Sequence, residues 1–168
     1  FTKVTLVAAL ALTALAEAAI ELDDTDEMIR AGGQLLIQGT TAGAASALAG
    51  AAGVLAEKAQ DLDAAERYAV KALELLEKTA ESPRPSEISE TEWEDQLRNS
   101  EGRYRDVLGW IKVLKGEMAA GLAYLEEAVS LVSDPGVYYH LGKTYERLGN
   151  RQEALQQQWQ SAPFSDGH

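Results

Sequence analysis

The C-terminal part of the chain repeats itself with a period of 33 residues. Leu141-Gly142 lies 33 positions after Leu108-Gly109 (142 − 109), and Gly149 lies 33 positions after Gly116 (149 − 116). A period of about 20 to 50 residues indicates that one supersecondary unit is used several times and that neighbouring copies stack on each other. The chain is therefore predicted to be a stack of similar units.

Small residues recur inside each unit at intervals of 12 and then 7 positions (121 − 109 and 128 − 121). The three sets are Gly53, Ala65 and Ala72; Gly109, Gly121 and Ala128; and Gly142, Ala154 and Ser161. Small side chains let two helices approach closely, so these positions predict packing contacts within helical hairpins. The first set predicts a third unit before the other two.

The residues between these positions favour helix throughout. Ala, Leu, Glu, Lys and Gln fill long stretches, and strand-length runs of alternating polarity are absent, so the fold class is predicted to be all-α. Asp134 is expected to cap a helix that begins at Pro135, Ser89 and Glu92 to form a capping box, and Gly149 to end a helix in the left-handed conformation. Turn residues predict breaks between helices at 23–24, 39–41, 60–61, 82–86, 115–116, 133–135 and 149–150.

Charge and cysteine content exclude several functions. The chain has 15 basic and 27 acidic residues and a formal net charge of −12, which repels phosphate backbones and anionic lipid headgroups. It has no cysteine and only two histidines, His140 and His168, so disulfides are excluded and a zinc site of the usual ligands is not expected. We expect no nucleic-acid partner, no metal and no cofactor.

The N-terminal segment has two interpretations. Lys3 precedes an apolar run over residues 4–16, and Ala14-Leu15-Ala16 has the small-residue pattern of a signal-peptidase site, which indicates a possible export signal. The run would be roughly 20 Å long as a helix, too short for a bilayer core of about 30 Å. We expect an ordered amphipathic helix and no membrane span, while the compartment, cytoplasmic or periplasmic, stays open.

The sequence of the last unit resembles that of a known repeat family. The segment Tyr138-Tyr139-His140-Leu141-Gly142-Lys143-Thr144-Tyr145, followed by Leu148-Gly149-Asn150-Arg151-Gln152-Glu153-Ala154-Leu155, resembles the tetratricopeptide repeat. The units from about Gly102 to Ser133 and from about Ser46 to Leu76 are similar to the same repeat, with Lys112 in place of the family's usual aromatic residue. The resemblance implies a right-handed superhelix of antiparallel helical hairpins, a solenoid typical of this family.

The expected organisation follows the repeats. Residues 1–45 form N-terminal helices, either a degenerate repeat or a signal-like segment; 46–80, 102–134 and 135–168 form units 1, 2 and 3; and 81–101 form an insertion. Residues 19–23 resemble a repeat's closing segment, so the first helix is predicted as the remnant of a fourth unit. The acidic stretch 87–95 is expected to extend the first helix of unit 2 by about two turns or more.

Catalysis is not expected. Carboxylate pairs such as Glu126-Glu127 suit a solvated helix face better than acid/base chemistry, because sequence gives no sign of an apolar enclosure. Serines and threonines are scattered without a nucleophile elbow, and His140 is expected to be a partly exposed polar residue. The Ala- and Gly-rich stretch 40–53 lacks the lysine of a phosphate-binding loop, so close helix packing is the better interpretation.

The resemblance implies a concave groove lined by the first helix of each hairpin. The groove-facing residues carried over are Tyr139, Lys143 and Glu146 from unit 3, Asp106, Trp110 and Val113 from unit 2, and Gly50, Val54 and Glu57 from unit 1. Some relatives hold a peptide's terminal carboxylate with Lys, Asn and Arg at such positions; only Lys143 matches here, so a helix or an extended apolar peptide is expected.

The predicted function is therefore a protein–protein interaction module that binds a peptide or partner protein. The alternative is a structural subunit of a larger complex, with the groove filled by the chain's own N-terminal helices or by a second copy in a homo-oligomer.

Overall fold

Eight α-helices make up the part of the chain that the computed structural model describes, residues 3–161, and no strand occurs among them. His168 lies outside these residues. The helices are α1 (Lys3–Glu21), α2 (Thr25–Gln38), α3 (Ala42–Glu57), α4 (Leu62–Glu81), α5 (Glu90–Leu114), α6 (Met118–Leu131), α7 (Pro135–Arg147) and α8 (Arg151–Ser161). Each predicted break falls between two consecutive helices, which confirms the all-α prediction.

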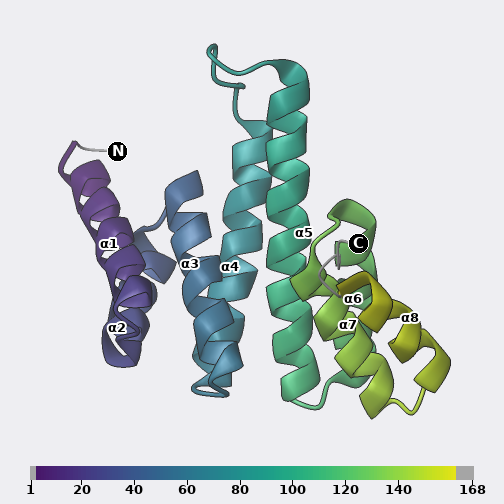
Figure 1. Ribbon diagram of the computed structural model, residues 1–168. Helices are drawn as coiled ribbons and strands as arrows, with labels where there is room; N and C mark the ends of the chain where they lie inside the picture. The colour runs from purple at the N-terminus through teal and green to yellow at the C-terminus, as the bar shows by residue number, and fades with distance from the viewer. Residues whose placement is uncertain (1–2, 162–168) are drawn as a thin grey trace, which may run out of the picture. The chain divides into compact units, whose positions relative to one another are not determined.

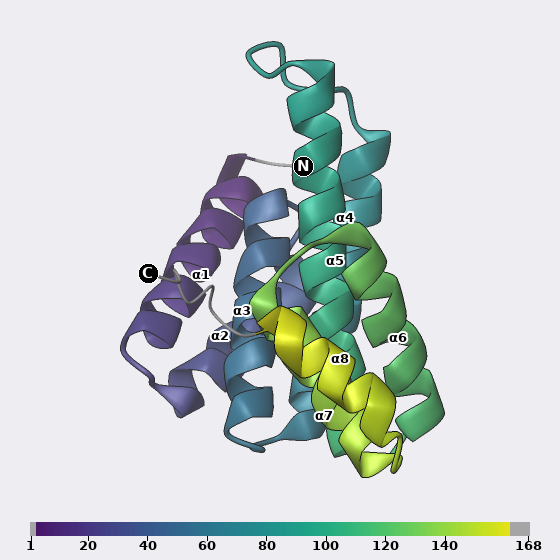
Figure 2. The same ribbon diagram turned by 45° about the vertical axis from the view of Figure 1, so that its right-hand side comes forward.

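The chain divides into two compact units, and the boundary between Leu97 and Arg98 lies within α5. In the first unit α1 pairs with α2 and α3 pairs with α4, while α1 also packs on α3 (Figure 1). In the second unit α7 packs on α6 and on α8 (Figure 2). Because α1 opens a hairpin with α2, it takes the place of a first helix rather than that of a closing segment.

Helix α5 begins at Glu90, twelve residues before Gly102, where the resemblance to the repeat begins (102 − 90). The predicted extension is confirmed, at roughly three turns. Its start is the predicted capping box: the Ser89 backbone N–H and hydroxyl donate to Glu92 Oε2 (3.0 and 2.6 Å), and the Glu92 backbone N–H donates to Ser89 Oγ (3.3 Å).

The same backbone turn joins the two helices of every hairpin. A residue just after each first helix has a positive φ: 57° at Asp23, 50° at Ala59, 86° at Gly116 and 77° at Gly149. The backbone N–H of the residue that follows donates a hydrogen bond of 2.9 Å to the carbonyl oxygen five residues earlier. The four pairs are Asp24 with Ala19, Gln60 with Leu55, Glu117 with Lys112 and Asn150 with Tyr145. This is the Schellman helix end, so the left-handed position predicted at Gly149 is confirmed.

Side chains cap several helix starts. Asp24, Thr41, Asp61 and Asp134 each accept a hydrogen bond from a backbone N–H in the first turn of the helix that follows. At Asp134 the acceptor oxygen lies 2.8 Å from the Gly136 nitrogen, and Pro135 is the first helical residue. The predicted start of this helix is thus confirmed.

The core of the first unit is built from alanines around one tyrosine. Helix α3 contacts α1, α2 and α4, and its buried residues are alanines together with Leu48 and Leu55. The fully buried Tyr68 of α4 donates a 2.7 Å hydrogen bond to the carbonyl of Ile29 in α2. A Cβ on Gly32 would lie 2.6 Å from the Tyr68 ring, so the glycine makes room for the tyrosine.

The core of the second unit centres on Val113, Leu125 and Leu141, which come from α5, α6 and α7. Partly buried Trp110, Met118, Leu122, Val129 and Tyr145 pack around them. Four of the small residues predicted to lie at helix contacts do so: Gly109 of α5 lies against Gly121 of α6, and Gly142 of α7 lies against Ala154 of α8.

Candidate functional site

Five of the residues predicted to bind a partner lie in the second unit, on α5 and α7. These are Asp106, Trp110, Tyr139, Lys143 and Glu146, and the sixth predicted residue of this unit, Val113 on α5, is described below. Two more, Val54 and Glu57, lie on α3 of the first unit, where Val54 is half-buried and Glu57 is exposed. Gly50 is also half-buried there, and a Cβ on it would lie 3.0 Å from Ile20. The side chains that interact with one another are those of the second unit.

Asp106 and His140 join α5 to α7. The Nδ1 atom of His140 lies 2.9 and 3.0 Å from the two carboxylate oxygens of Asp106, a residue that is only 8% exposed. Both carboxylate oxygens are therefore within hydrogen-bond distance of this ring nitrogen. The imidazole also stacks on the Trp110 ring, with 4.7 Å between ring centroids and 13° between planes. Asp106 and Trp110 thus fix the position of His140.

Two cations lie over aromatic rings beside this pair. The Arg147 guanidinium carbon is 5.1 Å from the centroid of Trp110, and Lys143 Nζ is 5.7 Å from the centroid of Tyr139. Both distances are within the range of cation–π attraction. Tyr139 is 50% exposed and its ring is tilted by 58° from that of His140. We name the residues Trp110, Tyr139, His140, Lys143 and Arg147 the α5–α7 surface.

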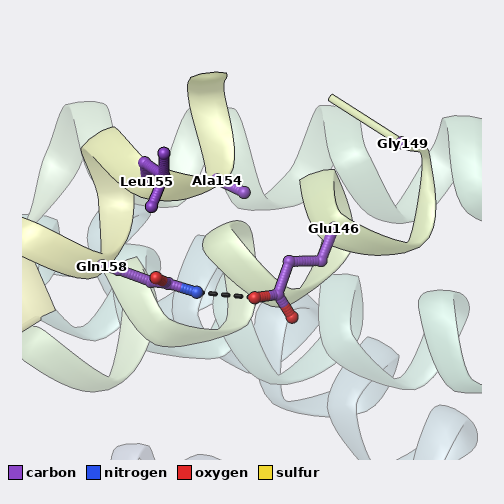
Figure 3. Close-up of a pocket in the computed structure, with 5 residues that line it drawn as sticks. All are labelled: Glu146, Gly149, Ala154, Leu155 and Gln158. Carbon is purple, nitrogen blue, oxygen red and sulfur yellow. Dashed lines mark hydrogen bonds between the residues drawn. The ribbon is translucent and has the colours of Figure 1, made fainter. Parts of the chain in front are cut away.

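Glu146 extends the network from α7 to α8. It accepts hydrogen bonds from Lys143 Nζ (2.9 Å) and from Gln158 Nε2 (2.6 Å, Figure 3). The hydrogen bond and charge of Glu146 raise the pKa of Lys143, and the hydrogen bond from Lys143 lowers the pKa of Glu146. At neutral pH both groups are therefore charged.

A shallow pocket of about 640 Å³ lies at this point, lined by Glu146, Gly149, Ala154, Leu155 and Gln158. Its wall is mixed, because it combines the polar Glu146 and Gln158, joined by the hydrogen bond drawn in Figure 3, with the exposed Leu155 on α8.

Val113 occupies a different environment from the other predicted residues. It is 2% exposed and packs with Leu125 and Leu141 in the core. The face of α5 that carries it is covered there by α6 and α7, so its side chain is not available to a partner. Asp106 is likewise buried, and its carboxylate contacts His140.

Sequence reasoning missed three features of the network: Arg147, Gln158 and the stacked position of His140. A sequence signal exists for Arg147, which follows Lys143 by four residues and so lies on the same side of a helix. Nothing comparable links Trp110 to His140, because that contact joins two helices.

The Asp106–His140 pair has the arrangement of the two supporting members of a hydrolase triad, which also needs a hydroxyl or thiol at the imidazole. The nearby hydroxyl of Thr144 is fully buried and donates to the His140 carbonyl oxygen (2.8 Å), so it is not placed as a nucleophile. Among the described residues no cluster of His, Asp and Glu could hold a metal ion. The geometry suits recognition better than catalysis.

Two properties of the described chain define its class. Antiparallel hairpins with one shared turn follow each other along the sequence, and no helix among residues 3–161 is long and apolar enough to cross a membrane. This is the architecture of a helical repeat protein, in which each hairpin buries its apolar face against its neighbours.

Comparisons with known proteins name the repeat. Residues 135–158 match the family model of the tetratricopeptide repeat. No curated protein sequence matches the chain. The fold is similar to the crystal structure of a thermophilic tetratricopeptide repeat protein from Thermus thermophilus, with 22% identity over 92% of this chain and 74% of that chain and a TM-score of 0.58.

Residues 135–158 thus match a tetratricopeptide repeat, and the described helices form antiparallel hairpins like those of the similar structure. Repeats of this family are protein-interaction modules and are typically scaffolds rather than enzymes.

Proposed function

We propose that the chain binds a peptide or a segment of a partner protein on the α5–α7 surface. The observation that carries the proposal is the exposed Tyr139 ring beside Lys143, Trp110 and Arg147, all held by contacts within the protein. Aromatic and arginine side chains supply much of the binding energy at protein interfaces, and rings that are already ordered lose little entropy on binding.

The charges of the surface favour one kind of ligand. Lys143 is paired with Glu146, and Arg147 lies over Trp110. A terminal carboxylate would have to compete with Glu146 for Lys143 and would approach a chain with a net charge of −12. A helical or extended peptide that places apolar side chains on the rings of Tyr139 and Trp110 fits better.

The test is selection of binding peptides from a random displayed library, followed by measurement of their affinity for single variants. Tyr139→Ala removes an exposed ring and should weaken binding by roughly tenfold or more, as a typical interface aromatic does. Ile37→Ala is the matched control, because Ile37 is 84% exposed on α2 in the other unit, and it should leave the affinity unchanged.

Circular dichroism of each variant shows whether the helices are retained. Selected peptides that bind wild type and Tyr139→Ala equally well, and that also bind Trp110→Ala and Lys143→Ala, would exclude the α5–α7 surface as the site.

The alternative role, a structural subunit of a larger assembly, is favoured by a separate observation. Large apolar side chains are exposed along α1, among them Val7 (65%) and Leu10 (53%). Exposed apolar patches mark interaction surfaces when they are contiguous.

A further inference from the structure

Helix α1 packs into the first unit mainly with small residues, and several of its described large side chains lie outside. Its buried residues are Ala9, Thr13, Ala16 and Ala19. Its exposed large residues are Leu6 (47%), Val7 (65%), Leu10 (53%) and Leu15 (41%). Apolar side chains of this size gain more free energy from burial than alanines do. The outer face of α1 therefore has the composition of a contact face.

The outer residues follow a regular spacing. Lys3, Val7, Leu10, Ala14, Glu17 and Glu21 succeed one another at intervals of four, three, four, three and four, and all six are exposed. We name these six residues the α1 seam. Alternating intervals of four and three are the heptad spacing of helices that pair lengthwise. The helix is 19 residues long, roughly 28 Å, enough for more than two heptads.

Charge is distributed unevenly along the α1 seam. Lys3 stands at its N-terminal end, and Glu17 and Glu21 stand at its C-terminal end. Two copies side by side in parallel would place like charges together at both ends. Two antiparallel copies would place Lys3 of each near Glu21 of the other. The face is complementary to itself in the antiparallel orientation only.

We infer that α1 pairs with α1 of a second copy of this chain, antiparallel and with two-fold symmetry. When Lys3 of one copy lies beside Glu21 of the other, Leu10 of the first copy lies beside Ala14 of the second. Both pairs fit the same register because Leu12 is midway between 3 and 21 and midway between 10 and 14. Each Leu10 then fills the space left by an alanine, and the contact is isologous, as in most homodimers. This dimer does not involve the α5–α7 surface.

Sedimentation velocity of the full chain at low ionic strength, over a range of protein concentrations, tests the pairing. Wild type should show a reversible monomer–dimer equilibrium that weakens as salt is added, because the end pairs are exposed. Leu10→Glu removes one leucine from each copy and places a charge in the seam, so the association constant should fall by roughly a hundredfold or more.

Ile37→Glu is the control, since it places the same charge at an exposed apolar residue on α2 and the variant should dimerise as wild type does. A wild-type chain that stays monomeric at every concentration, or a Leu10→Glu chain that dimerises as tightly as wild type, would overturn the inference.

Charge exchange tests the orientation. Lys3→Glu and Glu21→Lys should each weaken the dimer by about tenfold, because two symmetric pairs become repulsive. The double variant carrying both changes should regain wild-type association, since its antiparallel pairs are again complementary. Failure of the double variant to recover would exclude the antiparallel register.

The absence of cysteine provides a second readout of the same contact. Chains with Leu10→Cys, mixed with chains with Ala14→Cys, should form a mixed disulfide faster than either chain forms one with itself. Faster cross-linking of Leu10→Cys with itself would indicate parallel helices and contradict the proposal. Flotation with phosphatidylcholine vesicles tests whether the outer face of α1 binds a membrane instead. If wild type is monomeric and floats with the vesicles while Leu10→Glu does not, the face binds a membrane and the dimer is excluded.

Discussion

Gly109 of α5 and Gly121 of α6 touch through their backbones. A Cβ atom on Gly109 would lie 3.0 Å from the carbonyl oxygen of Gly121, and a Cβ atom on Gly121 would lie 2.8 Å from the carbonyl oxygen of Gly109. Side chains of Leu125 and Val113 also lie near these positions, but the carbonyl oxygens are backbone atoms, which cannot rotate away as a side chain can. The two helices of this hairpin are therefore as close as their backbones permit.

Gly121→Ala should destabilise the protein by roughly 1–3 kcal/mol, the usual cost of overpacking, although alanine favours helix. Gly43→Ala is the control, because its Cβ would lie 3.6 Å from the Thr13 methyl carbon, an ordinary contact. It should raise stability by up to about 1 kcal/mol. Chemical unfolding followed by circular dichroism measures both, and a Gly121→Ala variant as stable as wild type would contradict the close approach.

Opposite substitutions in two of the four hairpin turns should have opposite effects on stability. Ala59 has a φ of 50°, which an L side chain adopts with strain, so Ala59→Gly should stabilise the first unit by about 0.5–1 kcal/mol. Gly149, at 77° in the equivalent turn, should lose about 1 kcal/mol on replacement by alanine. Thermal unfolding of the two variants provides the comparison, and a shift of both midpoints in the same direction would show that the turns are not equivalent.

The phenol of Tyr145 should make stability depend on pH in the alkaline range. Burial, and then its hydrogen bond to Glu126 (2.8 Å), raise the pKa of Tyr145 from 10 to about 12. The folded state favours the neutral phenol, so this stabilisation is complete below pH 10 and is lost as the pH rises from 10 to about 12. Burial also raises the pKa of Tyr68, which acts in the same direction.

The free energy of unfolding, measured across this range, should therefore fall less steeply in Tyr145→Phe than in wild type. Glu126→Gln should reduce the slope only in part, because burial is the larger cause. Equal slopes in Tyr145→Phe and wild type would show that the ring is not shielded from solvent.

The Asp106–His140 contact predicts a graded loss of stability. Asp106→Ala removes the partner of the half-buried His140 imidazole, at a cost of about 1–3 kcal/mol, whereas Asp106→Asn keeps a polar partner and should cost less. Denaturant unfolding of both variants checks the order. If the alanine variant is the more stable of the two, the contact does not order α7 against α5.

Sequence patterns predicted those parts of the fold that depend on local chemistry. The breaks, the cap at Asp134, the capping box at Ser89 and the left-handed Gly149 each follow from a few neighbouring residues. The hairpin of α1 with α2 was not predicted as such, because its turn carries Asp23 where glycine would have been recognised. Local signals predicted the break at 23–24 but not the left-handed geometry of Asp23.

The candidate site was less predictable because it depends on contacts between helices. Val113 shares a face with Trp110 in the sequence pattern, yet α6 and α7 cover Val113 and leave Trp110 half-buried. The stacking of Trp110 on His140 joins residues 30 positions apart (140 − 110). Helical periodicity gives the direction of a side chain but not the neighbour that it meets.

The hairpin turns also explain why repeats can escape detection. Their hydrogen bonds join backbone atoms only, and the left-handed position holds aspartate, alanine or glycine with the same geometry. A hairpin can thus lose the glycine that marks it in sequence and keep its shape. The family model matches one hairpin here, although the turn occurs in four. For chains of this kind, counting repeats by glycine signatures gives a lower limit to their number.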